Sequence, residues 1–466
     1  MATTVAPTGA AQVTRTRDLR TLWRTALAVL APLPILALAL EMLVVPWPVG
    51  ANLVTAIAGA ADAPGRAQAS LWLSLFYALT VLPATMAVLW TGRRAAPKLT
   101  LAAGVLLIPA FSASLASNDL VAVVAARGGL DPAAVAAIDD LVQANPWVGI
   151  QFVVFLLGQT VGFVLLGLAL WRARVVPGWV AVVLGLSGPA HLLMPGGNAG
   201  AAAAWVMTAI GYAGASATLI RTRDADFDLP PGTAAAEPPP AGADTRTGWR
   251  WLLAVAAVPL AVFVTVFRFL LPYDAGDQPR EIFDKLVAAP TFQQTALAIG
   301  GLVALTGCAG VLAVAWHTRR HTPVLTTIGL FLAVPGYLAL FAGGPYADAL
   351  AYVTGTHPEV DREVAFALAS GMESSPQSNA LILVFVAGHL LGTIMVGVAL
   401  WRARIAPTWL AIGLIVSQPI HLTSVLTEIR ALDLVGWGLT AAGFGWAAWR
   451  LARTPNDQFD LAPTAR

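Results

Sequence analysis

Three histidines lie inside apolar stretches of this 466-residue chain. His191 and His421 each belong to the pattern S-x-P-x-H-L, in which the proline leaves a helical carbonyl without its donor. His389 lies nine residues into the apolar run 380–400, and Gln159 takes its place in a similar run. Because imidazole titrates near neutral pH and polar groups within membrane helices mark transport routes, the pattern predicts proton coupling or substrate binding. A structural network of interhelical hydrogen bonds explains the same residues without any ligand.

Haem binding is a third interpretation of the histidines. His389 and His421 are expected on consecutive helices and could supply two axial ligands, although Gln159 breaks that pair in the earlier run. We otherwise expect no cofactor and no metal, since the single cysteine, Cys308, rules out cysteine-based metal sites. The motifs H-E-x-x-H, G-x-S-x-G and Walker A are absent from the sequence, so an enzyme is not favoured.

Two charged residues, Glu41 and Arg268, fall near the outer ends of predicted spans. Placing a charged side chain inside the bilayer costs free energy. The two residues could meet as an ion pair, flank a polar cavity, or reach out to the membrane surface. With the histidines they make up a candidate binding layer, whose members are Glu41, Gln159, His191, Arg268, His389 and His421.

The motif L-W-R-A-R-x-x-P-x-W occurs twice, at 170–179 and 400–409, and contains Arg172, Arg174, Arg402 and Arg404. Arginines beside a proline and a tryptophan suit a tight hairpin at the cytoplasmic membrane surface, so we interpret them as topology anchors. The alternative is an anion or lipid-headgroup site between the two arginine pairs. Arg93, Arg94, Arg319 and Arg320 have the same two interpretations.

The composition identifies the setting in which these residues act. Hydrophobic residues make up 58% of the chain and charged residues 11%, and the mean hydropathy is +0.73. Soluble proteins carry about 25% charged residues, so the lipid bilayer is the expected partner. A net charge of only +2 argues against nucleic acid as a partner.

We predict an all-α integral membrane protein with about twelve transmembrane helices. A bilayer core about 30 Å thick needs roughly 20 apolar residues per helix. The predicted spans are 25–45, 70–91, 99–117, 148–170, 179–194, 200–220, 251–271, 293–316, 324–344, 380–400, 408–424 and 433–450.

The distribution of positive charge predicts the orientation of these spans. With the N-terminus inside, cytoplasmic segments hold 20 of the 27 Lys and Arg residues and outer segments hold 6. Cytoplasmic loops normally carry this excess. We therefore expect a multi-pass cell-membrane protein with both termini in the cytoplasm.

The chain contains an internal repeat. Residues 153–193 and 383–423 share 19 identities over 41 ungapped positions. Six spans in each half give both halves the same orientation, which predicts two parallel six-helix repeats. The expected domains are a cytoplasmic tail (1–22), the first repeat (23–220), a Pro/Ala-rich cytoplasmic linker (221–248), the second repeat (249–450) and a cytoplasmic tail (451–466).

Two longer outer segments, 118–146 and 345–379, occupy matching places in the repeats. Asp131-Pro132 and His357-Pro358 resemble helix starts, so we expect short outer helices. Such helices would either cap the bundle or act as lids over a binding site.

The module G-H-L-L-G…A-L-W-R-A-R…S-Q-P-x-H-L, best seen at 388–422, resembles a group of uncharacterised polytopic bacterial membrane proteins. That resemblance implies a membrane fold and no activity. The plan of two halves with basic loops, TGRRAAPK and HTRRHTPV, is weakly similar to major facilitator transporters. Neither loop contains the acidic residue of that family's pattern.

These observations favour a small-molecule or ion permease with a site between the two repeats. The alternatives are a non-transporting membrane sensor or complex subunit, and a membrane-embedded enzyme or haem protein. The sequence leaves the ligand, the energy coupling and the oligomeric state open.

Overall fold

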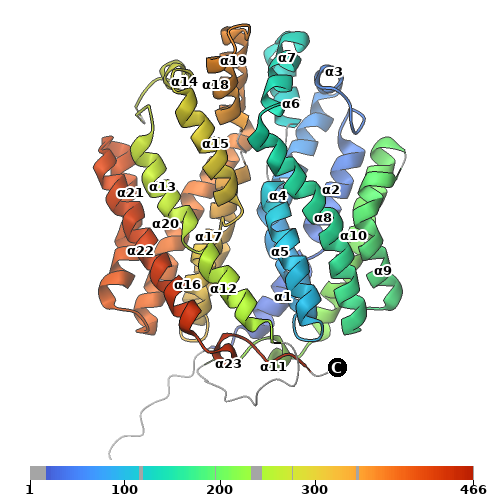
Figure 1. Ribbon diagram of the computed structural model, residues 1–466, viewed down its shortest axis with the longest axis vertical. Helices are drawn as coiled ribbons and strands as arrows, with labels where there is room; N and C mark the ends of the chain where they lie inside the picture. The colour runs from blue at the N-terminus through green and yellow to red at the C-terminus, as the bar shows by residue number, and fades with distance from the viewer. Residues whose placement is uncertain are drawn as a thin grey trace, which may run out of the picture.

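The computed structural model describes residues 17–114, 119–194, 196–231, 244–274, 276–342 and 346–464. Within these ranges every regular element is a helix, as expected for an all-α membrane protein (Figure 1). The first half, residues 20–227, contains α1 (Arg20–Leu30), α2 (Leu33–Val44), α3 (Leu53–Asp62), α4 (Pro64–Gly92), α5 (Pro97–Ala113), α6 (Asp119–Gly128), α7 (Pro132–Gln143), α8 (Pro146–Ala173), α9 (Gly178–Leu193), α10 (Gly197–Arg221) and α11 (Asp224–Phe227).

The second half, residues 246–459, follows with helices of similar order. They are α12 (Arg246–Ala256), α13 (Pro259–Leu270), α14 (Pro279–Val287), α15 (Pro290–Ala304), α16 (Ala309–Thr318), α17 (Pro323–Ala342), α18 (Tyr346–Thr356), α19 (Arg362–Glu373), α20 (Pro376–Ala403), α21 (Thr408–Thr427), α22 (Arg430–Arg453) and α23 (Asn456–Phe459). Residues 232–243 of the expected linker lie outside the described residues, as do residues 1–16 of the expected N-terminal tail.

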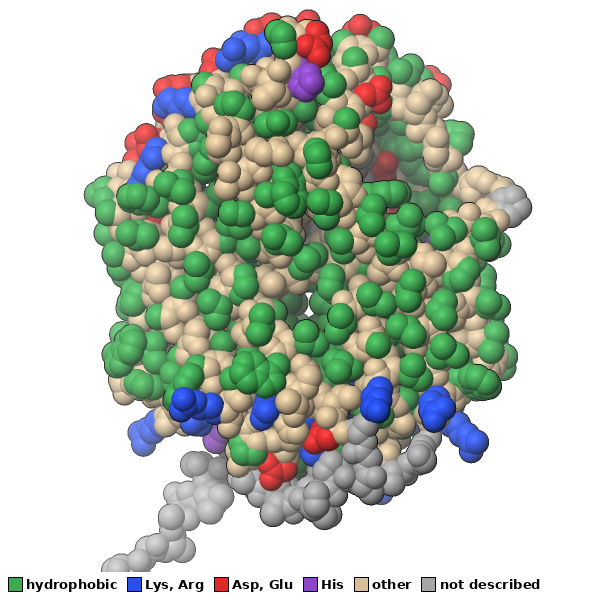
Figure 2. Space-filling view, viewed as in Figure 1, with side chains coloured by type: hydrophobic (Ala, Val, Ile, Leu, Met, Phe, Trp, Pro, Cys, Tyr) green, Lys and Arg blue, Asp and Glu red, His purple; other side chains and the backbone are tan. Residues whose placement is uncertain are grey.

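Nine helical segments of the described chain are long and apolar enough to cross a membrane. They are Arg20–Val44, Pro64–Gly92, Pro146–Ala173, Gly197–Arg221, Arg246–Leu270, Pro290–Thr318, Pro323–Thr356, Pro376–Ala403 and Thr408–Thr427. Figure 2 shows the surface that results, a broad apolar band with Lys and Arg side chains along its lower edge and charged side chains of both signs at the top. The chain is therefore a multi-pass membrane protein.

The three other predicted spans correspond to α5, α9 and α22. The first two are shorter, at 17 and 16 residues, or about 25 Å of helix at 1.5 Å per residue. The third, α22, has 24 residues and carries Arg430 and Asp433 in its first turn. Twelve spans accordingly remain a prediction.

Proline residues divide two of the long segments into paired helices. Helix α2 has Pro32 at its N-cap, directly after α1, and α13 begins at Pro259, close after α12. Proline lacks the amide hydrogen that a continuous helix needs. By contrast, α9 and α21 continue through Pro189 and Pro419 without ending.

The two ends of the bundle differ in structure. One end, here called the capped end, is covered by α3, α6, α7, α14, α18 and α19, which share an apolar cluster of their own. The opposite end, here called the basic end, contains α11 and α23 and the start of α1 (Figure 1). A larger apolar core lies between these ends, in what is here called the membrane part. It contains residues from both halves.

The two halves contact each other along much of their length. Helix α4 packs on α17 and α8 packs on α15 within the membrane part, while α6 packs on α19 and α7 on α18 at the capped end. The outer segments therefore form short helices, as expected. Asp131 caps α7, which begins at Pro132, but the expected start at His357-Pro358 is wrong because α19 begins at Arg362. Asp361 supplies the N-cap there by accepting backbone hydrogen bonds.

Candidate functional site

A polar cluster in the membrane part lies in the second half, where α22 packs on both α13 and α21. Nε of Arg268, on α13, lies 2.8 Å from Oδ2 of Asp433, on α22. The other carboxylate oxygen, Oδ1, contacts Nδ1 of His421, on α21. Asp433 is only 2% exposed, so its charge depends on these two partners for compensation.

His389 on α20 lies beside this cluster. Its Nδ1 donates a hydrogen bond to the carbonyl of Phe385 at 2.6 Å, which leaves Nε2 as an acceptor. Within the described residues Nε2 is buried without a hydrogen-bond partner. The ring centroid of His389 is 5.6 Å from that of His421 and 6.0 Å from that of Trp437.

Close helix packing holds His389 in place. A Cβ atom on Gly336 of α17 would lie 2.5 Å from the backbone nitrogen of His389, and one on Gly388 would lie 2.6 Å from the Leu332 carbonyl. Only glycine allows α17 and α20 to approach this closely. Tyr337, in the same contact region, exchanges a 2.9 Å hydrogen bond with Thr393 of α20.

Further polar side chains lie between α21 and α22. The amide of Gln418 donates to Ser417 at 2.9 Å and to Thr440 at 3.1 Å, and all three residues are buried. These contacts are what an interhelical hydrogen-bond network requires. A pocket lies above them toward the capped end, lined by Arg268, Leu271, Tyr273, Asp274, Ser424, Glu428, Arg430 and Asp433.

The candidate binding layer is therefore divided between the halves. Arg268, His389 and His421 come together within the second half. In the first half, Glu41 accepts a 2.5 Å hydrogen bond from Ser74. The ring of His191 contacts that of Trp205 in a tilted arrangement, with 4.1 Å between the ring centroids. Gln159 is buried on α8, in the place that His389 takes on α20.

Arg268 pairs with Asp433 of its own half, and not with Glu41 as one interpretation of the sequence expected. Asp433 was missed because it falls at the first position of the predicted span 433–450. An acidic residue at that position suits the positive end of a helix dipole, which accounts for Asp433 without any partner. The usable signal was Trp437 four residues later, since His421 and Trp437 mirror His191 and Trp205.

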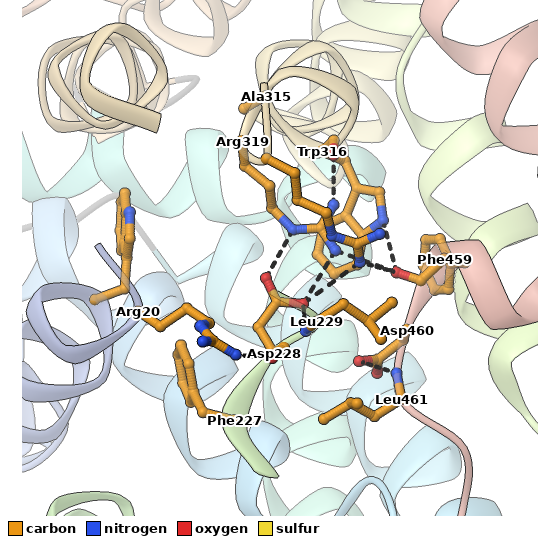
Figure 3. A network of polar contacts seen from close by, with 12 residues as sticks. Arg20, Phe227, Asp228, Leu229, Ala315, Trp316, Arg319, Phe459, Asp460 and Leu461 are labelled. Atoms are coloured by element: carbon orange, nitrogen blue, oxygen red, sulfur yellow. Dashed lines mark hydrogen bonds and ion pairs between the residues drawn. The ribbon is translucent and has the colours of Figure 1, made fainter. Parts of the chain in front are cut away.

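A second set of polar contacts joins the two halves at the basic end. Asp228, which follows α11, lies 3.0 Å from Nε of Arg319 and 3.5 Å from Arg320, both of which follow α16. Asp460, which follows α23, lies 2.7 Å from Nε of Arg93, which follows α4. Each half therefore supplies a carboxylate to the arginines of the other half. Figure 3 shows Asp228 pointing toward Arg319 and Phe459 lying on the far side of the same guanidinium.

Main-chain carbonyls complete this arrangement, which we call the crossed network. The carbonyl of Phe227 accepts hydrogen bonds from Arg93 at 2.8 Å and from Nε1 of Trp90 at 2.9 Å. The Arg93 guanidinium lies 3.7 Å over the Trp90 ring, a cation–π contact. The corresponding residues of the second half are Phe459, Arg319 and Trp316.

Electrostatics keeps the crossed network charged. Burial raises the pKa of Asp228, but Arg319 and Arg320 lower it further, so the result is below the ordinary value. Burial, reinforced by Arg319, lowers the pKa of Arg320 to about 10, which still leaves it protonated at neutral pH. Burial and Arg320 also lower the pKa of His321. The sequence suggested Arg93, Arg94, Arg319 and Arg320 as anchors or as an anion site, but not as partners of carboxylates across the halves.

The four arginines of the repeated hairpin motif lie on the surface. Arg172 and Arg402 are exposed in the last turns of α8 and α20, and Arg174 and Arg404 are exposed C-caps with φ of 50° and 53°. The following helices, α9 and α21, lie at opposite edges of the bundle (Figure 1). This placement leaves the two arginine pairs apart and favours their interpretation as anchors.

Metal and haem ligation require separate consideration. Within the described residues no group of three or more His, Cys, Asp and Glu side chains could hold a metal ion. His389 and His421 both use Nδ1 in hydrogen bonds, which leaves Nε2, the usual iron ligand, on each ring. Haem ligation by this pair stays a prediction that no observation tests.

Comparison of the chain with protein-family models, with curated proteins and with solved structures gave no match.

Proposed function

We propose that this multi-pass membrane protein is a permease for a small solute or ion, in which two six-span repeats move against each other. The observation that carries this proposal is the crossed network. Ion pairs between the halves, 9% exposed at Arg93 and Asp460, hold the basic end together. A permeation path toward the basic end requires these pairs to separate.

Matched elements support the duplication. Helices α8 and α20 each have 28 residues, α7 and α19 each have 12, and α11 and α23 each have 4. The crossed network uses the same residue types at matching places in both halves. Two parallel repeats of this kind are known from secondary transporters.

The course of the chain supports twelve crossings. Helix α5 begins near Arg93 at the basic end, and α6 follows it in the apolar cluster of the capped end. Helix α9 begins beside the end of α8, and Asn198 after it binds the backbone of Val49 near α3. Helix α22 runs from Arg430, bonded to Asp274, toward Asn456, bonded to Asp244. Each of these helices therefore carries the chain from one end to the other.

The excess of Lys and Arg at the basic end supports a cytoplasmic location for that end and for both termini. The family assignment, to a group of uncharacterised bacterial membrane proteins, remains a proposal on the repeated module alone.

One observation favours a second candidate function, a non-transporting membrane sensor or complex subunit. The cluster of Arg268, Asp433, His421 and His389 lies inside one half, whereas a permease site was expected between the halves. A sensor needs only a buried titratable group and a surface that responds to it.

Thiol accessibility distinguishes the two functions. Leu101 of α5 packs on Gly248 near the basic end, and Gln151 of α8 packs on Gly301 near the capped end, so both report on the contact between halves. Each is changed to cysteine in a Cys308→Ala background, and the rate of reaction with a small charged thiol reagent is measured with and without Asp228→Asn and Asp460→Asn. A permease predicts faster reaction at Leu101→Cys and slower reaction at Gln151→Cys. A sensor or subunit predicts no opposite change, and such a result would overturn the permease proposal.

A further inference from the structure

We propose that His421 and Asp433 form a proton-binding site in the membrane part of the second half, with His389 as the next proton acceptor. This inference goes beyond permeation, because a proton site serves a sensor as well as a permease. It rests on side-chain geometry within one half and does not require the halves to move.

The hydrogen bond between His421 and Asp433 defines which atom receives the proton. Asp433 is ionised beside Arg268, so Nδ1 of His421 must carry the hydrogen that it shares with Oδ1. The indole Nε1 of Trp437 also lies 3.2 Å from Nδ1 of His421, but its N–H cannot donate to Nδ1 while Nδ1 carries that hydrogen. Nε2 of His421 is then the lone-pair atom of a neutral imidazole and takes up the additional proton.

The charges around His421 are balanced before the proton binds. The cluster of Arg268, Asp433 and neutral His421 has no net charge, and protonation gives it a single positive charge next to a carboxylate. The groups that face His421 are Asp433 from α22 and His389 from α20, with Arg268 of α13 held behind the carboxylate. Tyr337 of α17 faces His389 at a ring distance of 6.3 Å.

His389 provides the next position for the proton. It is 1% exposed, its Nδ1 hydrogen is bonded to Phe385, and its Nε2 lone pair is without a partner among the described residues. A proton that leaves Nε2 of His421 can bind to Nε2 of His389, and no other bond is broken. A buried acceptor without a hydrogen bond, such as Nε2 of His389, costs free energy. Binding the proton from His421 would give this atom a role.

A pocket lies beside this site toward the capped end. Asp433 and Arg268 both line the pocket formed with Tyr273, Asp274, Glu428 and Arg430. The charged residues of this pocket make it suitable for water. The carboxylate of Asp433 thus lies between this pocket and His421.

The first half provides a matched control because it repeats the histidine but not the carboxylate. The ring of His191 contacts that of Trp205 as the ring of His421 contacts that of Trp437. Four residues before Trp437 the chain has Asp433, and four residues before Trp205 it has Ala201. We therefore expect proton binding at His421 and not at His191.

Tryptophan fluorescence tests the proposal, because a protonated imidazole quenches a neighbouring indole. The purified full chain is titrated in detergent between about pH 5 and 8, the range in which histidine is the usual titrating group. Subtraction of the Trp437→Phe curve isolates the signal of Trp437 from other pairs, such as His317 with Trp446. The expected difference is a sigmoidal quench on acidification that His421→Gln abolishes and His191→Gln leaves unchanged.

Two further variants keep the test decisive if His421→Gln fails to fold. Asp433→Asn removes the charge that favours the imidazolium and should move the midpoint to lower pH by about 1–3 units. His389→Leu, which removes the acceptor, should also move the titration midpoint to lower pH. His389→Gln keeps an acceptor oxygen and should move the midpoint less. A flat wild-type difference curve, or a transition that survives both His421→Gln and Asp433→Asn unchanged, would overturn the proposal. Neither result bears on movement of the halves, so the permease proposal is tested separately.

Discussion

Asp460 accepts a 2.7 Å hydrogen bond from Nε of Arg93, although 367 residues separate the two in the chain. Asp228 makes the corresponding contact with Arg319 from the opposite direction. Each half of the protein therefore ends in a short segment whose carboxylate neutralises an arginine of the other half. This exchange links the halves at the basic end through two sets of ion pairs.

Removing either carboxylate should weaken this contact. Asp460→Asn leaves Arg93 buried without a counter-charge, and loss of one partner from a buried ion pair costs about 3–5 kcal/mol. Thermal unfolding in detergent is followed with a thiol-reactive dye, since Cys308 is the single cysteine and is buried. Asp226→Asn, at a more exposed carboxylate that pairs with Arg223, serves as the control and should leave the midpoint unchanged. Equal midpoints for both variants would contradict the crossed network.

Acid should remove the contribution of Asp228. Because Arg319 and Arg320 hold its pKa below the ordinary 3.8 despite burial, the ionised carboxylate stabilises the fold above that pH. The stabilisation is lost as the pH falls through the lowered value. The difference in unfolding midpoint between wild type and Asp228→Asn should be constant above about pH 4 and vanish below it. A difference that persists to the lowest pH would show that ionisation of Asp228 does not stabilise the protein.

The ion pair in the membrane part should behave as a coupled unit. Arg268→Met leaves Asp433, 2% exposed, with His421 as its remaining partner, whereas Asp433→Asn leaves Arg268 with access to the pocket. The first change should therefore lower the unfolding midpoint more than the second. The double variant should lose less than the sum of the two, with a coupling of about 0.5–3 kcal/mol. Additive losses would mean that the pair contributes nothing as a pair.

Much of the membrane part could be predicted from the sequence. His389 and His421 lie about 20 Å along their helices from the hairpin that joins α20 and α21, at 1.5 Å per residue. Equal depth on consecutive antiparallel helices brings them together, and the spacing of the residues alone contains that information. The basic hairpin motif likewise marked the ends of α8 and α20 correctly.

The pairing of charges could not be predicted in the same way. Whether Arg268 meets Glu41 or Asp433 depends on which helix packs against α13, and hydropathy carries no information about helix neighbours. The partners of Arg93 and Arg319 depend on how the two halves are placed against each other. Matching residue types indicated a repeat, but repetition does not say whether a contact forms within a half or between halves.

The backbone conformation at the hairpin arginines should affect stability more than their charge does. Arg404 has φ of 53°, a left-handed conformation that glycine adopts freely and branched residues resist. Arg404→Gly should keep the free energy of unfolding within about 1 kcal/mol of the wild-type value. Arg404→Val should lower stability by about 1–3 kcal/mol. The control Arg402→Val, in the last turn of α20, should change it less. Equal losses for the glycine and valine variants at 404 would show that the guanidinium itself is required.

The relative movement of the halves is tested most directly by distances between spin labels. Lys98 and Val324, each one residue after the proline that begins α5 and α17, report on the basic end. Ala133 of α7 and Glu359, before α19, report on the capped end. Each pair is changed to cysteine in a Cys308→Ala background, labelled, and measured in lipid with and without Asp228→Asn and Asp460→Asn. The account predicts a longer distance at the basic end together with a shorter one at the capped end when the carboxylates are removed. Unchanged distances, or a lengthening at both ends, would contradict it.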